Sequence, residues 1–241
     1  MMILALESSG LVASAALVTP GKIVGEFSTD FKKTHSQTLL PMTDALLKMT
    51  GVELSELDAV AVSGGPGSFT GLRIGSATAK GLGLALGIPI VSVPTVDGIA
   101  YNMAGTDALV CPVMDARRNQ TYTGLYTFEN GEMKCLCPQK AVAIEEIIGQ
   151  INSIGRKVIF LGDGVPVFRQ VIDEKLKTPH EYAPIHLAVQ RAGTLGALAL
   201  RYYEQGRYVS AAEHRPDYLR PSQAERVLSE KNGAGSMGGG A

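Results

Sequence analysis

Short apolar runs separated by turn residues dominate the start of the chain. An apolar run over 3–6 ends at Glu7, and two further runs over 13–19 and 22–28 are separated by Pro20-Gly21. Apolar runs of this length, bounded by glycine and proline, are typical of strands joined by tight turns. The pattern therefore predicts a meander of three strands.

Helical and strand-like patterns alternate after this meander, and the second half of the chain repeats the order. The first half continues with a helix over 36–49, a strand over 59–67, a glycine-rich helix over 69–86 and a strand over 88–94. The second half has strands over 108–118, 121–128 and 132–137, a helix over 144–151, a strand over 157–164 and a helix over 166–176. Both halves thus read β-β-β-α-β-α, with an acid, Glu7 or Asp115, near the end of the first strand. This order predicts an α/β fold of two lobes, each a mixed sheet with helices on its faces.

The repeat divides the chain into a first lobe over 1–106, a second lobe over 107–227 and a glycine-rich tail over 228–241. The tail can bury almost no apolar surface, so we expect it to be flexible. A last helix over 188–205 either closes the second lobe or packs back on the first.

Composition narrows the class of protein. The 241 residues are 45% hydrophobic and 19% charged with a net charge of −1, so no broad basic footprint for nucleic acid exists. The most apolar stretch, over 81–100, is interrupted by Pro89 and Pro94 and does not predict a membrane helix. The three cysteines form no disulfide framework and the first residues lack a basic leader, which together favour the cytoplasm.

The segment "SGGPGSFTGLRIG" over 63–75 resembles a nucleotide-binding loop, but its spacing fits neither familiar motif. From Gly65 to Gly71 it is one residue longer than a P-loop, and Leu72-Arg73 replaces the required lysine and hydroxyl residue. Small residues instead recur every four positions, at 71, 75, 79, 83 and 87. A helix with such a stripe lets another backbone approach closely, either from the chain's own sheet or from a second molecule.

The helix over 36–49 has apolar residues on two faces. Leu39, Met42, Leu46 and Met49 form one, while Leu40, Thr43 and Leu47 form the other. One face must cover the sheet, and the other would expose large apolar groups unless it belongs to a wide core stripe. We therefore expect partner-binding residues on both helices of the first lobe: Leu39, Leu40, Met42, Leu46, Met49, Gly71, Leu72, Gly75, Ala79 and Leu82.

Three motifs in the same order, "SGGPGSFTGLRIG", "MDARRNQTYTGLY" and "YLRPSQAER", resemble the bacterial TsaB family. The duplicated lobe with an acid in its first hairpin is similar to the superfamily of actin, sugar kinases and Hsp70 ATPases. The resemblance implies a two-lobed actin-like ATPase fold of the ribonuclease H-like (ASKHA) type.

The same resemblance implies a role in tRNA modification. TsaB proteins are a dimerisation subunit of the complex that makes N6-threonylcarbamoyladenosine next to the anticodon of ANN-decoding tRNAs. This chain would be non-catalytic, docking and ordering a catalytic, metal-binding TsaD-like paralogue of the same fold. A P-loop ATPase (TsaE-like) would be a further partner. We expect a homodimer when the chain is alone, contact with tRNA only through the complex, and no membrane association.

The metal site of the catalytic paralogue is not expected in this chain. That paralogue carries a His-x-x-x-His pair after the fifth strand of its first lobe, whereas residues 94–100 here contain no histidine. The four histidines include no pair three or four positions apart, so a helical two-histidine site is excluded. We expect neither a metal nor another cofactor, which disfavours a metallopeptidase.

The acids at the ends of the two first strands leave two interpretations open. Glu7 and Ser8 with Asp115 and Arg117 would line a vestigial nucleotide cleft between the lobes. Alternatively, the two acids only anchor strand ends through backbone hydrogen bonds. If the first interpretation holds, an alternative function remains open: the chain would be a stand-alone small-molecule kinase or ATP-binding protein of actin-like fold. Four arginines, Arg117, Arg118, Arg220 and Arg226, would contact tRNA or the partner, or be solvated.

Overall fold

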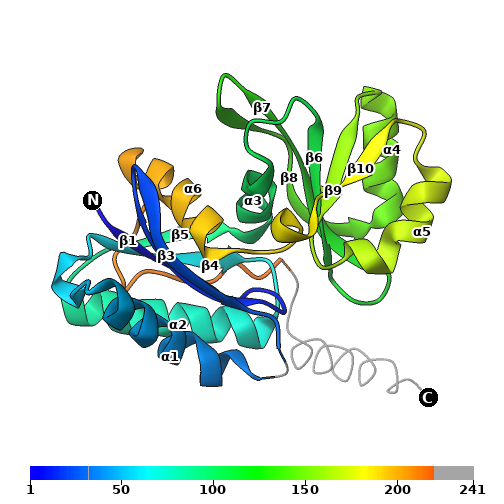
Figure 1. The fold of residues 1–241 in the computed structure, drawn as a ribbon. Coiled ribbons are helices and arrows are strands. Elements are labelled where there is room, and N and C mark those ends of the chain that lie inside the picture. Colours follow the sequence, from blue (N-terminus) through cyan, green and yellow to red (C-terminus); the bar gives the residue numbers. More distant parts are fainter. Residues whose placement is uncertain (32, 220–241) are drawn as a thin grey trace, which may run out of the picture.

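The first half of the chain forms a five-stranded mixed sheet. The computed structural model describes residues 1–31 and 33–219. Its first sheet has the order β3-β2-β1-β4-β5, in which β1 pairs antiparallel with β2 and parallel with β4 (Figure 1). The elements are β1 (Ile3–Glu7), β2 (Ala13–Thr19), β3 (Lys22–Thr29), α1 (His35–Thr50), η1 (Leu54–Glu56), β4 (Ala59–Gly65), α2 (Phe69–Leu86) and β5 (Ile90–Pro94).

The second half repeats this sheet. Its order, β10-β9-β6-β7-β8, is the order of the first sheet read from the other edge, with the same parallel and antiparallel pairs. The elements are β6 (Leu109–Asp115), β7 (Gln120–Glu129), β8 (Glu132–Ala143), α4 (Ile144–Ile154), β9 (Val158–Leu161), α5 (Val165–Lys175) and β10 (His180–Tyr182). The predicted α/β fold of two β-β-β-α-β-α lobes with mixed sheets is confirmed.

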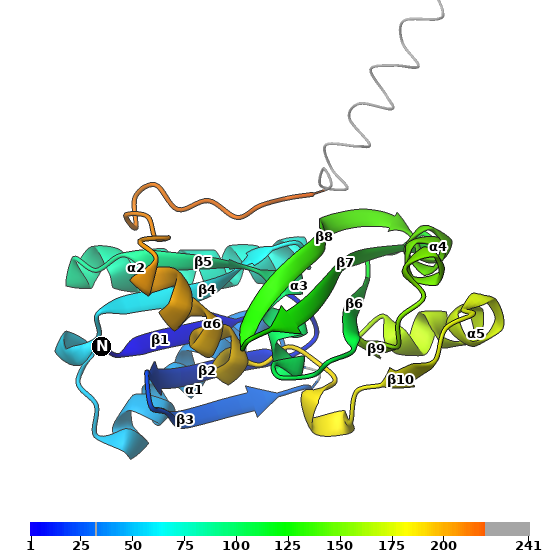
Figure 2. The ribbon, with the colours of Figure 1, turned by 90° about the horizontal axis from the view of Figure 1, so that it is seen from above.

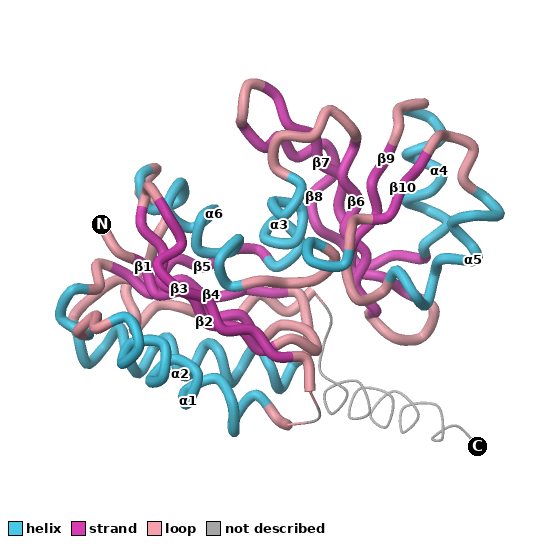
Figure 3. The backbone as a smooth tube through the Cα atoms, in the orientation of Figure 1, coloured by secondary structure: helices cyan, strands magenta, loops and turns pink. Residues whose placement is uncertain are grey.

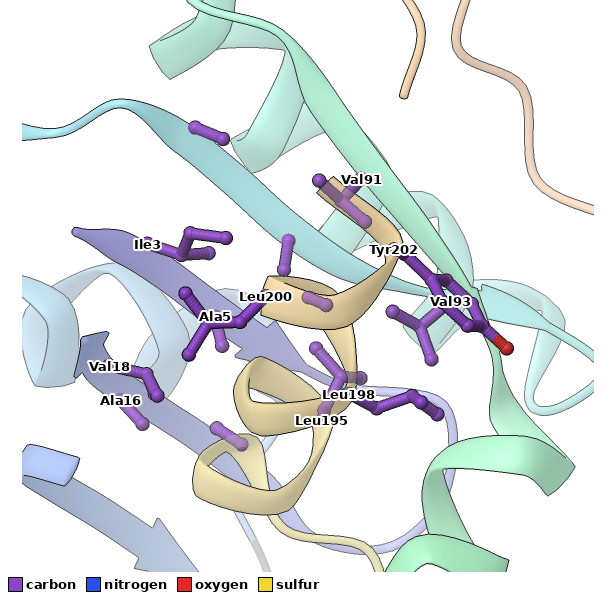
Figure 4. Close-up of a cluster of buried hydrophobic side chains, with 14 residues drawn as sticks. Ile3, Ala5, Ala16, Val18, Val91, Val93, Leu195, Leu198, Leu200 and Tyr202 are labelled. Atoms are coloured by element: carbon purple, nitrogen blue, oxygen red, sulfur yellow. The ribbon is translucent and has the colours of Figure 1, made fainter. Parts of the chain in front are cut away.

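Two helices cross between the lobes. The short helix α3 (Thr95–Ala100) leaves the first sheet and packs its Val96 and Ile99 on the second sheet; the sequence analysis did not predict it. The helix α6 (Ala192–Glu204) leaves the second sheet, after η3 (Ile185–Leu187), and covers the first (Figure 4). Of the two placements that the sequence left open for this helix, the structure shows packing on the first lobe.

Asp97 of α3 joins the lobes through hydrogen bonds. Its Oδ1 accepts from the Tyr126 hydroxyl of β7 at 2.6 Å, and its Oδ2 accepts from the Tyr202 hydroxyl of α6 at 2.9 Å. Burial raises the pKa of Tyr126 well above its usual value, and the charge of Asp97 raises it further. Both hydroxyls therefore remain donors at neutral pH. The turn η2 (Tyr101–Met103) follows α3 and continues to the second sheet.

Helices α1 and α2 lie side by side on the face of the first sheet opposite α6 (Figures 1 and 3). The strands separate the two faces by alternation, because successive side chains point to opposite sides of a sheet. Ile3 and Ala5 of β1 pack with α6, whereas Leu4 and Leu6 pack with α1 and α2. Pro41 lies inside α1 and not in its first turn, and the helix continues through it.

The chain after α6 returns along the first lobe as a C-terminal strap, residues 209–219 (Figure 2). Val209 exchanges two backbone hydrogen bonds with Ile90 at the free edge of β5. Lys80 of α2 donates to two strap carbonyls, and the Asp217 amide donates to the Gly64 carbonyl at 2.6 Å. The strap thereby ties α2, the sheet and the space between the lobes together. Within the described residues, no helix is long and apolar enough to cross a membrane.

Candidate functional site

Helix α1 exposes two large apolar side chains. Leu40 is 56% exposed and Met49 is 76% exposed, while Met42 is half-buried. Leu39 and Leu46, each 1% exposed, instead lie in the core against the sheet. The prediction that these two leucines contact a partner is therefore wrong, because their side chains are buried in the chain's own core.

The glycine stripe of α2 packs on the chain's own first hairpin. A Cβ added at Gly71 would overlap the Ser8 carbonyl oxygen, and one added at Gly75 would overlap the Ser8 hydroxyl. Leu72 and Ala79 are buried on the same side of the helix, and Leu82 packs partly against the core. The expectation that Gly71, Leu72, Gly75 and Ala79 contact a partner is therefore wrong: all four are buried in the chain's own first lobe, and the missing side chains of Gly71 and Gly75 make room for the turn after β1.

A second stripe of small residues on α2 points outward, and the sequence analysis missed it. Ala77, Gly81 and Ala85 are exposed at a spacing of four, and nothing lies within 4 Å of a Cβ added at Gly81. Positions two residues apart lie on nearly opposite sides of a helix. The repeat at 77, 81 and 85 was visible in the sequence, yet only the packing decides which repeat faces the sheet. We call Leu40, Met49, Ala77, Gly81 and the exposed Leu84 the outer helix face.

A cavity of about 470 Å³ lies between the lobes. Six segments line it: the turn after β1, the start of α2, the turn after β6, strand β7 with Tyr122, the loop after β9 and the strap. Among the residues predicted for a cleft, Asp115 and Arg117 line this cavity. Glu7 and Ser8 are buried behind it.

Glu7 and Asp115 each hold their own turn in the same way. An oxygen of Glu7 accepts from the amide of Ser9 at 2.7 Å, and Oδ1 of Asp115 accepts from the amide of Arg117 at 2.7 Å. The Ser9 hydroxyl also donates to Glu7, and the Arg117 guanidinium pairs with Asp115 at 3.1 Å. Burial raises the pKa of Glu7. These bonds are the backbone anchoring that the second interpretation describes.

Asp163 is a cavity residue that the sequence analysis missed. It follows β9, in the loop that corresponds to the glycine-rich segment after β4 in the first lobe. Burial, with a contribution from the negative charge of Asp115, raises its pKa to about 6. Its Oδ1 is buried and has no hydrogen-bond partner within residues 1–31 and 33–219. The loops after β4 and after β9 occupy equivalent places in the two halves of the sequence, and this equivalence was the signal that could have pointed to Asp163.

The turn between β6 and β7 places two guanidinium groups at the cavity. Arg117, Arg118 and Asn119 have φ values of 63°, 56° and 56°. This left-handed conformation costs about 1–2 kcal/mol for each such residue. Arg118 has no ion pair or hydrogen bond with any other described residue. Arg220 and Arg226 lie outside the described residues.

Comparison with known proteins decides the family. The family model of TsaD, tRNA N6-adenosine threonylcarbamoyltransferase, matches residues 23–227. A Bacillus subtilis protein named tRNA threonylcarbamoyladenosine biosynthesis protein TsaB is 34% identical over 93% of this chain and 96% of its own length. The Escherichia coli protein of that name is 26% identical, over 96% of this chain and its full length. This chain belongs to the TsaB family.

Solved structures of similar proteins support the fold of this TsaB-family chain. YeaZ from Pseudomonas aeruginosa is 30% identical with a TM-score of 0.74, covering 90% of this chain and 99% of its own. A second Pseudomonas aeruginosa structure, described as similar to the peptidase YEAZ, is 29% identical with a TM-score of 0.76 over 91% of this chain and 99% of its own. The predicted family is thus confirmed, and the YeaZ structures share the two-lobed α/β fold of this chain.

In this TsaB-family chain the described residues include no group of three or more histidine, cysteine, aspartate or glutamate side chains placed to hold a metal ion. His35 of α1 lies within 2.8 Å of the Gly10 carbonyl, where it holds the first hairpin. His214 of the strap is buried, and burial lowers its pKa to about 4. Both imidazoles thus lie in structural positions.

Proposed function

We propose that this chain acts in tRNA N6-threonylcarbamoyladenosine biosynthesis as a non-catalytic subunit that docks and orders a TsaD-like paralogue. The names of its curated relatives and the match to the TsaD family model support the pathway and the partner. The outer helix face carries the proposal, because it is the apolar surface on the two helices that the sequence marks for docking. As parts of the same proposal, the chain works in the cytoplasm, with a TsaE-like ATPase as a further partner and tRNA reached through the complex.

The outer helix face has the chemistry of a helix-packing surface. Ala77, Gly81 and Ala85 would let a partner helix approach α2 closely, as small residues do at tight helix crossings. Leu40 and Met49 are exposed on the neighbouring helix α1, where a spacing of nine residues puts them on opposite sides of that helix, and burial of each from water would contribute up to about 1.5–3 kcal/mol. Methionine adapts to partners of different shape, which suits a face that exchanges a second copy of this chain for the paralogue.

The engagement of the cleft acids supports a non-catalytic role. In an actin-like kinase such acids would hold a metal ion or a water molecule, whereas here Glu7 and Asp115 accept hydrogen bonds from their own turns. The alternative, a stand-alone kinase or ATP-binding protein, has the cavity of about 470 Å³ in its favour. That alternative predicts stoichiometric binding of Mg²⁺-ATP to the isolated chain, abolished by Asp115→Asn.

Light scattering on a sizing column tests the docking role. The full chain is run alone and mixed with the TsaD-like paralogue from the same genome, as wild type and as the variants Gly81→Leu and Met49→Asp. We expect a two-subunit mass alone and a one-to-one complex in the mixture. Each variant should weaken both assemblies at least tenfold, because each places bulk or charge where a helix would pack.

Val167→Asp is the matched control, since Val167 is an exposed apolar residue on α5 of the other lobe. Circular dichroism confirms that every variant is folded. If Gly81→Leu and Met49→Asp bind the paralogue as the control does, the outer helix face is not the docking surface. A wild-type chain that stays monomeric and ignores the paralogue would exclude the docking role altogether.

A further inference from the structure

The cavity between the lobes contains groups of both charges that the described protein leaves unsatisfied. The Arg118 guanidinium is exposed and has no partner among the described residues, and the buried Oδ1 of Asp163 has none either. A buried polar atom without a hydrogen bond costs about 1–3 kcal/mol, so the Oδ1 of Asp163 is the atom that points to a ligand, whereas the exposed Arg118 carries no such cost. The left-handed turn that holds Arg118 adds a further cost to the empty arrangement.

Groups that favour an anion gather on one side of the cavity. Arg118 presents a planar guanidinium suited to a carboxylate. The first turn of α2 also lines the cavity, and the amides of Phe69 and Thr70 have no acceptor within the described part of the chain. The Ser68 side chain caps only the amide of Gly71, at 3.3 Å. The α2 terminus supplements Arg118, and on its own it would not define a site.

Asp163 supplies the opposite end of the site. Its neighbour Asp115 is already bonded to Arg117, so the free oxygen of Asp163 is the one that needs a donor. Near pH 6 this carboxyl is half protonated, because burial and the charge of Asp115 raise its pKa. A bound ammonium group would supply both a donor and a positive charge and would restore the ionised form.

Aromatic and apolar side chains form the walls between these two ends. The rings of Phe69 and Tyr218 stand 4.7 Å apart at the mouth, and Tyr122 and Met114 line the same cavity. The volume of about 470 Å³ is within the range of small-molecule sites and exceeds the needs of one ion. A nucleoside triphosphate fits the charges poorly, since Asp217 adds a third carboxylate to the lining.

We propose that the cavity between the lobes binds a small zwitterion of the amino-acid class, with its carboxylate at Arg118, its ammonium group at Asp163 and an apolar side chain against the rings. This inference goes beyond docking of the paralogue and does not depend on it. The ligand would contact both lobes, because each lobe contributes residues to the lining of the cavity.

Titration of the isolated full chain, followed by amide NMR and calorimetry, tests this site. The probes are L-phenylalanine, 3-phenylpropionate, which lacks the ammonium group, and 2-phenylethylamine, which lacks the carboxylate. We expect L-phenylalanine to shift the amides of Gly67 and Gly162 and to bind at least about tenfold more tightly than either analogue. Each analogue loses a charge-assisted hydrogen bond of a strength that corresponds to such a factor.

Variants assign the two ends of the ligand. Arg118→Gln and Asp163→Asn should each weaken binding of L-phenylalanine about tenfold, while Asp107→Asn, an exposed aspartate away from the cavity, should leave it unchanged. Equal affinity for the zwitterion and either analogue would overturn the proposal. The proposal would also be overturned if L-phenylalanine, L-threonine and glycyl-L-phenylalanine all left the amide signals of Gly67 and Gly162 unchanged, or if only Mg²⁺-ATP shifted those signals.

Discussion

Two glycines of the same helix should respond in opposite ways to the same substitution. Alanine is favoured over glycine in a helix interior by about 0.5–1 kcal/mol. Nothing lies near a Cβ added at Gly81, so Gly81→Ala should raise the free energy of unfolding by this amount. Gly75→Ala receives the same helix contribution, but its Cβ overlaps the hydroxyl of Ser8, which is fully buried.

The cost at Gly75 has two parts. Overpacking a tight site costs about 1–3 kcal/mol. Movement of Ser8 also breaks the hydrogen bond from its hydroxyl to the Gly71 carbonyl, 2.8 Å long, which contributes about 0.5–1.5 kcal/mol. Gly75→Ala should therefore be less stable than Gly81→Ala by about 2–4 kcal/mol.

Urea denaturation of both variants and the wild type, followed by circular dichroism at 222 nm, measures this difference. We expect the midpoint to rise for Gly81→Ala and to fall for Gly75→Ala, with similar slopes, since both changes act on the folded state. Equal stability of the two variants, within about 0.5 kcal/mol, would refute the reasoning. It would mean that a methyl group at Gly75 meets no more resistance than one at Gly81, so that Gly75 does not lie tightly against the first hairpin.

Three further changes test other parts of the structure. Asp97→Ala removes the acceptor of the Tyr126 and Tyr202 hydroxyls, so the free energy of unfolding should fall by about 2–4 kcal/mol, measured by urea denaturation; a loss below 1 kcal/mol would contradict the lobe junction. Asp163 has a folded pKa of about 6 against an ordinary value of 3.8, so its stability contribution is present at low pH and is lost as the pH rises through 6. Asp163→Asn should therefore gain about 1–3 kcal/mol over the wild type between pH 4 and pH 8, and a gain independent of pH would contradict this. Gly65 has a φ of +114° and lies against the strap, so Gly65→Ala should speed proteolysis within residues 209–219 while leaving cleavage in the second lobe unchanged.

The fold was largely predictable from the sequence, because it depends on local periodicity. The run at 3–6 that ends at Glu7 and the runs at 13–19 and 22–28 have the length and the bounding turn residues of strands, and the observed strands lie within a few residues of these bounds. The repetition of the pattern in the second half then predicted a second lobe with the same order of strands and helices along the chain. The exchange of α3 and α6 between the lobes was not predictable in this way, since it joins residues about 100 positions apart, such as Asp97 and Tyr202.

The candidate site was predictable only in part. The two helices that carry the outer helix face were identified from their apolar and small residues, as was the place of Asp115 and Arg117 at the end of a strand. Asp163 was missed because a single aspartate in a turn has no distinctive spacing, and its burial depends on the opposite lobe.

The sequence alone determined the two lobes, the order of strands and helices along each half, and the family motifs, because periodicity and turn residues act over a few neighbouring positions. It also determined that α2 has four-residue repeats of small residues. Tertiary structure alone decided which repeat is buried, because both satisfy helix geometry equally and only the approach of Ser8 distinguishes them. The same reason applies to the cavity: its charged residues come from three segments, the turn after β6, the loop after β9 and the strap, and their proximity follows from how the chain folds in space.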